Sequence, residues 1–203
     1  MNKMTNNQIK TIGNFLSTYH SDLNYIRNFE RFKNDKISHN EFISKEYGSF
    51  YSFLIEFRVI RNVNKNQVSK LLKETNLWIE KANADDVDKF AMLICKKGLT
   101  HGKVMTSLAS KILFLNNPWV IFPFDNLAKK TLNQKTNEYS DYVSRIGKYK
   151  NENIEFAKST FKTIELYIKT IESEYKNDLK DISSIRYNRF MDKLLWTGVK
   201  MNN

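Results

Sequence analysis

The residue best suited to chemistry stands at the end of one unusual stretch of the sequence. A short glycine-containing turn and a helical segment are followed by an apolar loop that holds both prolines of the chain, Pro118 and Pro123, and then by Asp125. Helical spacing resumes at Asn126, which places Asp125 at or near a helix N-terminus. The carboxylate either caps that helix, which contributes about 1 kcal/mol, or faces a cleft behind a rigid loop that excludes water. The residues alone slightly favour the cap.

Charge and composition limit the classes of molecule that the protein is expected to bind. With 33 Lys+Arg and 22 Asp+Glu, the formal net charge is +11 and the pI is near 9.5, which favours nucleic acid over an anionic membrane surface. The single cysteine, Cys95, excludes a disulfide scaffold and a cysteine-based zinc site. The sequence has no phosphate-binding glycine loop and no paired histidines, so we expect no metal and no cofactor. It also lacks a signal peptide pattern and an apolar run as long as a membrane span. We therefore expect a cytoplasmic protein with no membrane partner.

The elements that must position these residues are predicted to be helices. Six Gly and two Pro in 203 residues leave little turn chemistry for a many-stranded sheet, and apolar residues recur at helical spacing almost throughout. We therefore predict an all-α fold. No linker, repeat or low-complexity block interrupts the sequence, so residues 1–203 are predicted to form a single domain. This domain can consist of two lobes with a cleft between them. Within it, Asn83 is predicted to cap a helix that ends at Gly98.

Two C-terminal segments carry distinct apolar patterns. Residues between Ile154 and Ile171 follow alternating spacings of three and four, a heptad seam. The seam is too short for a stable coiled-coil dimer, so we expect one long helix packed within a monomer. The terminal helix, residues 184–199, has an apolar stripe that includes Trp196, which is predicted to lie in the core. Asp192 and Lys193 are expected to be charges on the surface of that helix.

Three blocks of the sequence resemble the helix-hairpin-helix DNA glycosylase superfamily. The blocks SLASKIL, beginning at Ser107, and FPFD, ending at Asp125, resemble the signature "S-x-A-S-K … F-P-x-x-D" of small bacterial 8-oxoguanine DNA glycosylase-like proteins. The block RFMDKLLWTG, beginning at Arg189, resembles their terminal "R-x-x-D-K-x-L-W-x-x-G". The segment 97–132 then corresponds to a hairpin, helix, loop and aspartate. Some members of this group act in phage defence by removing glucosylated hydroxymethylcytosine.

The resemblance implies a role for each candidate residue. Asp125 would stabilise the sugar cation that forms when the base departs, or activate water. The flipped base would be held by aromatic side chains, for which the candidates are Tyr51, Trp78, Trp119, Phe122 and Phe124. The DNA backbone would be bound by residues of the turn and its neighbourhood, namely Lys96, Lys97, His101, Gly102, Lys103, Lys129 and Lys130.

The catalytic lysine of the superfamily has two possible counterparts in this sequence. Superfamily members place it roughly eighteen to twenty residues before the aspartate, and here Ser107 lies 18 residues before Asp125, whereas Lys111 lies 14 before it. Ser107 at this position implies a monofunctional enzyme. Lys111 would instead form a Schiff base and nick the abasic site, which requires a neutral amine. The turn also has one glycine, Gly102, where superfamily hairpins have two.

Two functions from different classes therefore remain. The first is a DNA glycosylase acting on a damaged or modified base, either an oxidised guanine or a hypermodified phage base. The second is a non-catalytic helical DNA-binding protein of a regulatory or defence system. Both account for the positive charge and the helices, but the enzyme alone explains an aspartate that follows a two-proline apolar loop.

Overall fold

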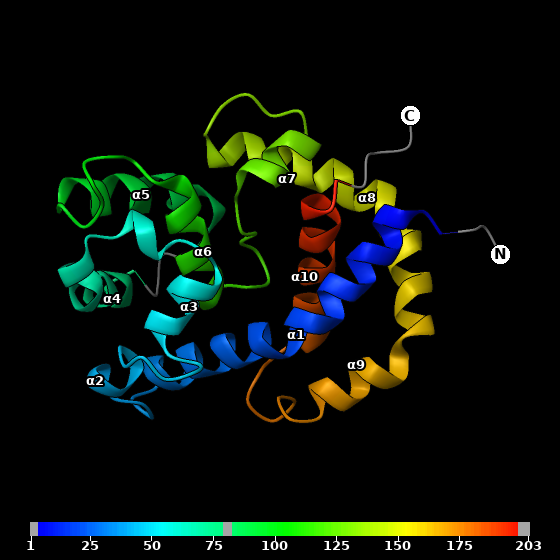
Figure 1. Cartoon of the computed structure of the whole chain (residues 1–203), viewed down its shortest axis with the longest axis horizontal. Coiled ribbons are helices and arrows are strands. Elements are labelled where there is room, and N and C mark those ends of the chain that lie inside the picture. Colours follow the sequence, from blue (N-terminus) through cyan, green and yellow to red (C-terminus); the bar gives the residue numbers. More distant parts are fainter. Residues whose placement is uncertain (1–3, 79–82, 199–203) are drawn as a thin grey trace. The chain divides into compact units, whose positions relative to one another are not determined.

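A computed structural model describes residues 4–78 and 83–198, which excludes Val199 at the end of the predicted terminal helix. These residues form helices and no strand, so the all-α prediction is confirmed (Figure 1). The α-helices are α1 (Asn6–Lys33), α2 (His39–Phe42), α3 (Phe50–Glu56), α4 (Val68–Asn76), α5 (Val87–Lys96), α6 (Thr106–Asn116), α7 (Asn126–Thr131), α8 (Tyr139–Thr163), α9 (Glu165–Glu172) and α10 (Ile182–Trp196). Short 3-10 helices are η1 (Ile60–Asn62), η2 (Lys65–Gln67) and η4 (Ala84–Asp86).

The chain forms two compact units, which we describe separately. Unit 1 comprises Met1–Leu23 and Phe124–Asn203, and unit 2 comprises Asn24–Pro123. Helix α1 contributes its first part to unit 1 and its last part to unit 2. The chain passes from unit 2 to unit 1 between Pro123 and Phe124, so the segment 97–132 is divided between the units.

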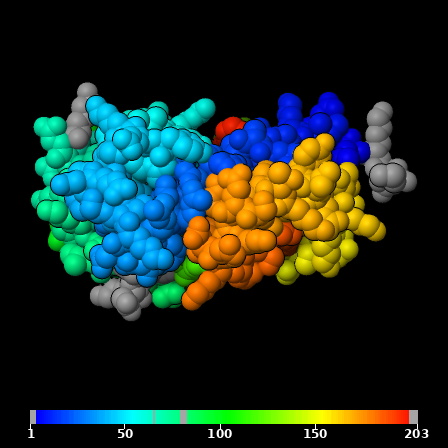
Figure 2. All heavy atoms as spheres, turned by 90° about the horizontal axis from the view of Figure 1, so that it is seen from below, coloured from blue at the N-terminus to red at the C-terminus, as the bar shows by residue number. Residues whose placement is uncertain are grey.

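The core of unit 1 is built around α10. Phe190 is fully buried, and its ring lies 5.5 Å from that of Phe15, 5.9 Å from Phe156 and 5.1 Å from Phe161, measured between centroids. Helix α7 is tied to α10 by the Thr131 hydroxyl, which donates to the carbonyl of Leu195 at 2.8 Å. Figure 2 shows α9 and the segment that follows it, in orange, at the surface of this unit. In unit 1, α1 and α8 therefore pack aromatic residues onto α10.

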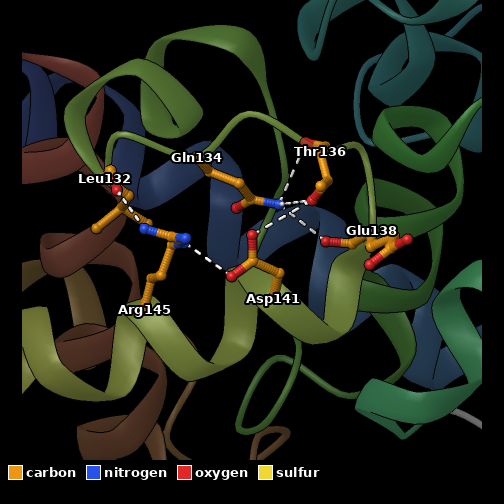
Figure 3. Close-up of polar contacts among 6 residues, drawn as sticks. All are labelled: Leu132, Gln134, Thr136, Glu138, Asp141 and Arg145. Atoms are coloured by element: carbon orange, nitrogen blue, oxygen red, sulfur yellow. Dashed lines mark hydrogen bonds and ion pairs between the residues drawn. The ribbon is translucent and has the colours of Figure 1, made fainter.

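The loop between α7 and α8 is held by its own side chains (Figure 3). Gln134 is buried, and its amide nitrogen donates to the carbonyl of Glu138 at 2.9 Å and to that of Thr136 at 3.3 Å. Arg145 on α8 donates to Asp141 at 2.8 Å and back to the carbonyl of Leu132 at 3.2 Å. These bonds fix where α8 begins relative to α7 and therefore where the first tyrosines of α8 lie.

Unit 2 contains α5, a turn and α6. Asn83 and Asp86 form a capping box ahead of α5, and Gly98 follows the end of α5 with φ of 69°, a left-handed conformation that favours glycine. Both predicted boundaries are thus confirmed. Asn64 holds the turn, because its side chain donates to the carbonyl of Gly98 at 2.7 Å and its backbone N–H donates to Leu99 at 3.0 Å.

Three predictions about the C-terminal segments are wrong. Trp196 is 41% exposed, because it is the last residue of α10 and lies about 100° around the helix from the buried Leu195. The predicted long helix is interrupted at Ile164, whose ψ of 18° separates α8 from α9. Asp192 is 8% exposed rather than a surface charge, because it faces an arginine inside unit 1.

The exposure of Trp196 changes the expected cost of truncating it. We expect Phe190→Ala to lower the free energy of unfolding by about 3–5 kcal/mol, as truncation of a buried aromatic residue does. Trp196→Ala should lower it by about 1 kcal/mol or less, because substitutions at the surface of a protein cost little stability. Urea denaturation of the two variants and the wild type gives this comparison directly. Equal losses in the two variants would contradict the assignment of Phe190, and not Trp196, to the core.

Candidate functional site

Asp125 caps α7 with one of its two carboxylate oxygens. Its backbone is extended, with φ of −148° and ψ of 172°, and its Oδ1 accepts from the N–H groups of Leu127 and Ala128, both at 2.9 Å. The cap interpretation of the sequence is therefore confirmed. The side chain is half-buried, and Oδ2 accepts no hydrogen bond from the part of the chain that the structure describes. One oxygen is thus anchored, which orients the other.

The residue before Asp125 lies in an aromatic cluster of unit 1. Phe124 is 3% exposed, and its ring meets those of Tyr142 and Tyr139 edge-on, at centroid distances of 4.8 and 6.4 Å. Lys129 on α7 lies over the same ring, with Nζ 5.8 Å from the centroid, and donates to Asn137 at 2.5 Å. The ring of Phe124 is therefore enclosed, and it fixes the backbone from which the Asp125 side chain projects.

A buried ionic cluster lies within electrostatic range of Asp125. Arg189 is 2% exposed and donates to Asp192 at 2.8 Å and to Asp22 at 2.9 Å. Burial raises the pKa of the Asp192 carboxyl, an effect that Arg189 opposes and the charge of Asp125 reinforces. Burial also raises the pKa of Tyr142 well above its usual value, with further contributions from Asp192 and Asp125. The charge of Asp125 thus adds to the effect of burial at both Asp192 and Tyr142.

Sequence reasoning missed this cluster, although a signal for it is present. Arg189 and Asp192 lie three residues apart on α10, on either side of Phe190 and Met191, both of which are fully buried. A charged pair at helical spacing inside an apolar stretch indicates a buried ion pair, because an isolated charge in that position would be costly. The position of Asp22, 167 residues away in sequence from Arg189, has no local signal.

Ser107 and Lys111 lie one turn apart on α6 in unit 2, as predicted. Both are half-buried. The amine of Lys111 donates to the carbonyl of Phe57 at 3.1 Å, and Phe57 is the C-cap residue of α3. A cation at this end of a helix interacts favourably with the exposed carbonyls. Lys111 therefore has a structural role. Asp125 belongs to unit 1, whereas Ser107 and Lys111 belong to unit 2.

The turn between α5 and α6 exposes its cationic residues. His101, Gly102 and Lys103 are all exposed, and Gly102 has φ of 69°. Thr100 closes the turn by donating from its hydroxyl to the carbonyl of Lys103 at 2.7 Å. Helix α6 has Met105 as its N-cap with no side-chain cap bond. Its first N–H groups therefore adjoin an exposed lysine, an arrangement that suits an anion.

The other predicted binding residues differ in their surroundings. Lys96 and Lys130 are exposed, whereas the charge of Lys97 is matched by Glu74 at 2.7 Å. Among the predicted base-holding residues, Phe122 is 5% exposed, whereas Tyr51, Trp78 and Trp119 are half-buried. Trp78 lies against Phe90 at a centroid distance of 5.4 Å, and Lys45 lies 5.8 Å from the ring centre of Tyr51. All of these aromatic residues belong to unit 2, as do Lys96 and Lys97, whereas Lys129 and Lys130 belong to unit 1.

The capping role of Asp125 predicts a difference between two substitutions. Asp125→Ala removes both hydrogen bonds to the α7 backbone and is expected to lower the free energy of unfolding by about 1 kcal/mol. Asp125→Asn keeps a capping oxygen and should cost less than half of that, because asparagine caps helices about as well as aspartate. Urea denaturation measures both values. If the two variants lose the same stability, the capping oxygen that asparagine keeps does not account for the loss, and the charge of the carboxylate does.

Among residues 4–78 and 83–198, no helix combines the length and the apolar character that crossing a membrane requires. Comparison of the chain with protein-family models, with curated proteins and with solved structures finds no match.

Proposed function

We propose that the protein is a DNA glycosylase that cleaves the N-glycosidic bond of a damaged or modified base and leaves an abasic site. The observation that carries this proposal is the geometry of Asp125. Its Oδ1 is anchored by two backbone N–H groups, and its Oδ2 is uncommitted among the described residues. A helix cap alone requires one oxygen, so the second is available for chemistry.

The chemistry of base excision suits a fixed carboxylate. As the base departs, positive charge develops on the sugar, as it does in glycoside cleavage. A carboxylate held in place beforehand stabilises that charge without reorganising, which is worth about two to three orders of magnitude in rate. The cap on Oδ1 would supply this preorganisation in the present protein. The base leaves with the electron pair of the broken C–N bond. Water then adds to the sugar carbon, and the proton that this water loses is taken up by the departing base or by solvent.

Binding of DNA would draw on the exposed turn of unit 2 and on the net charge of the chain. The turn places Lys103 beside the uncapped start of α6, where backbone N–H groups and a positive dipole favour a phosphate. Lys96 of unit 2 and Lys130 of unit 1 are exposed and each adds positive charge to its own unit. The net charge of +11 supports association with a polyanion at long range. The half-buried Tyr51, Trp78 and Trp119 are the candidates for contact with an unstacked base.

Of the two mechanisms, excision without strand cleavage is more strongly supported than attack by Lys111 through a Schiff base. Lys111 spans to the C-terminal end of α3, where its amine donates to the Phe57 carbonyl. A Schiff-base mechanism would require the amine to leave this contact and lose its proton. A mechanism with serine at this position needs no deprotonated amine. The spacing of 18 residues from Ser107 to Asp125 also matches the spacing between lysine and aspartate in the helix-hairpin-helix glycosylases that the sequence resembles.

The second candidate function is a non-catalytic helical DNA-binding protein. One specific observation favours it: the cap of α7 accounts for the presence of an aspartate at position 125 without any chemistry. This protein would use the same exposed turn to bind DNA. The two functions differ in whether the charge of Asp125 matters for anything beyond stability.

The first test is base excision by Asp125→Asn. Purified protein is incubated with duplexes carrying oxidised, alkylated, deaminated or glucosylated bases, and hot alkali reveals abasic sites. On the substrate found, we expect Asp125→Asn to reduce excision at least about 100-fold, because it removes a charge that stabilises the transition state, while DNA binding persists. Asp178→Asn, an exposed aspartate of unit 1, is the matched control and should excise normally.

Two further samples in the same assay, one without alkali and one with borohydride, distinguish a monofunctional enzyme from one in which Lys111 attacks the sugar. Without alkali the strands should remain intact, and borohydride should trap no covalent complex, because no lysine attacks the sugar. A trapped complex that Lys111→Gln abolishes would replace the monofunctional mechanism. Near-wild-type excision by Asp125→Asn would overturn the assigned role of the carboxylate. DNA binding with no excision on any duplex would favour the second candidate.

The second test concerns the exposed turn. Binding to duplex DNA should weaken by orders of magnitude between about 50 and 200 mM salt, because bound lysines displace counterions. We expect Lys103→Gln to reduce the slope of log affinity against log salt by about one. Lys176→Gln removes the same charge from an exposed position in unit 1 and should leave the slope unchanged. Fluorescence anisotropy of labelled DNA measures the affinity of the wild type and of both variants at each salt concentration. Affinity independent of salt would rule out the nucleic-acid partner.

A further inference from the structure

We propose that the outward side of α9 binds the same surface on a second copy of this chain, so that the protein forms an antiparallel homodimer. The surface consists of five exposed residues, which we call the α9 face: Glu165, Leu166, Tyr167, Lys169 and Thr170. This assembly differs from the monomer that the sequence predicts. It goes beyond the proposed glycosylase function and does not depend on it.

The centre of the α9 face is apolar. Leu166 is 75% exposed and Tyr167 is 63% exposed, whereas Ile168, on the other side of the helix from Leu166, is buried. Figure 2 shows α9, in orange, at the surface of unit 1. Two adjacent large apolar side chains in contact with water favour association with another surface, because burying them there removes apolar area from water.

The hydroxyl groups near Leu166 already have acceptors within the helix. The Thr170 hydroxyl donates to the carbonyl of Leu166 at 2.9 Å, and the Ser173 hydroxyl, three residues further on, donates to the carbonyl of Thr170 at 2.7 Å. A hydroxyl whose hydrogen bond is made within the protein can be covered at little cost. The residues around Leu166 therefore present a nearly apolar surface to a partner.

The charges at the edge of the α9 face are arranged symmetrically about Tyr167. Glu165 and Lys169 lie one turn apart, with the carboxylate 2.6 Å from the amine, and both side chains are exposed. At about 100° per residue, these two residues lie on one flank of the helix and Tyr167 lies on the other. The level of Tyr167 along the helix is midway between the negative and the positive charge.

A twofold axis at the level of Tyr167 makes the α9 face complementary to itself. When two copies of α9 run antiparallel about this axis, their charged flanks lie on the same side, and Glu165 of each copy is opposite Lys169 of the other. The two Leu166 side chains then meet at the centre, and the two Tyr167 side chains meet on the second flank. In a parallel pair, the charged flank of each copy would instead face the tyrosine flank. The charge pattern therefore favours a second copy of this chain in the antiparallel orientation.

The size of the α9 face and the charge of the protein set the strength of the dimer. The 8 residues of α9 form a short helix, about 12 Å long, so the buried area is below that of a standard protein interface. Repulsion between two chains with a net charge of +11 opposes association, and salt screens this repulsion. We therefore expect a weak dimer whose fraction rises with protein concentration and with salt.

The first experiment is sedimentation equilibrium of the full-length protein, from about 10 µM to about 1 mM, in about 150 mM salt. We expect Leu166→Ser to raise the dissociation constant of the dimer at least about tenfold, because the substitution is present in both copies. Leu77→Ser alters a leucine of unit 2 that is 71% exposed and should leave the dissociation constant unchanged. A wild type that stays monomeric throughout this range would overturn the proposal, and so would equal effects of the two substitutions.

Charge reversal tests the antiparallel pairing. Glu165→Lys and Lys169→Glu each place like charges opposite each other and should each weaken the dimer at least about threefold. Lys148→Glu makes the same change at an exposed lysine of α8 that also pairs with a glutamate one turn away, and it should not weaken the dimer. Because Lys169→Glu lowers the net charge of the chain, it would strengthen an association that did not depend on this pairing.

Recovery of the dimer provides the decisive result. An equimolar mixture of the Glu165→Lys and Lys169→Glu variants restores opposite charges across the axis, and so does the variant that carries both substitutions. Both samples should therefore associate about as strongly as the wild type. Circular dichroism checks that every variant keeps its helices, which is expected because the substituted side chains are exposed. If neither sample recovers the association, the antiparallel dimer through α9 is wrong.

Discussion

The buried guanidinium of Arg189 is the interaction on which unit 1 depends. It joins α1 to α10 through Asp22, and it holds Asp192 within α10 itself. All three side chains are nearly excluded from water, so each is stable only while its partners are present. Removing one partner of such a cluster leaves an uncompensated charge and typically costs about 3–5 kcal/mol. The aromatic residues around Phe190 pack onto the same helix, and the position of α10 in turn sets the position of α7 and its cap.

Charges at helix ends link the stability of the protein to its proposed chemistry. Asp125 accepts N–H groups at the start of α7, and Lys111 donates to a carbonyl at the end of α3. Both contacts have the sign that the helix dipole favours. The two residues differ in what chemistry would require of them. The carboxylate has a second oxygen that accepts no hydrogen bond among the described residues. The amine of Lys111 would have to lose a proton and leave the Phe57 carbonyl before it could attack the sugar. This asymmetry is the physical reason for assigning the chemistry to Asp125 and a structural role to Lys111.

The residues proposed to bind DNA and the residue proposed to act on the sugar are mostly assigned to different units. The cationic turn between α5 and α6 and the half-buried aromatic residues belong to unit 2, and Asp125 with its ionic neighbours belongs to unit 1. Within unit 1, the loop held by Gln134 and Arg145 sets the start of α8 and so the tyrosines around Phe124. The carboxylate thus projects from a segment that is supported on both sides, which is what preorganisation requires.

Local signals in the sequence determined the helices, the cap at Asn83, the end of α5 at Gly98 and the cap at Asp125. Each depends on residues within a few positions of one another, which is the range of helix periodicity and capping. Tertiary structure alone decided that Asp192 is buried, that Trp196 is exposed and that Lys111 reaches Phe57. Periodicity shows that a helix has an apolar face, but the width of that face depends on which other helices cover it. Asp22, the partner of Arg189 on α1, lies 167 residues away from it in the sequence, so no local pattern could have placed it.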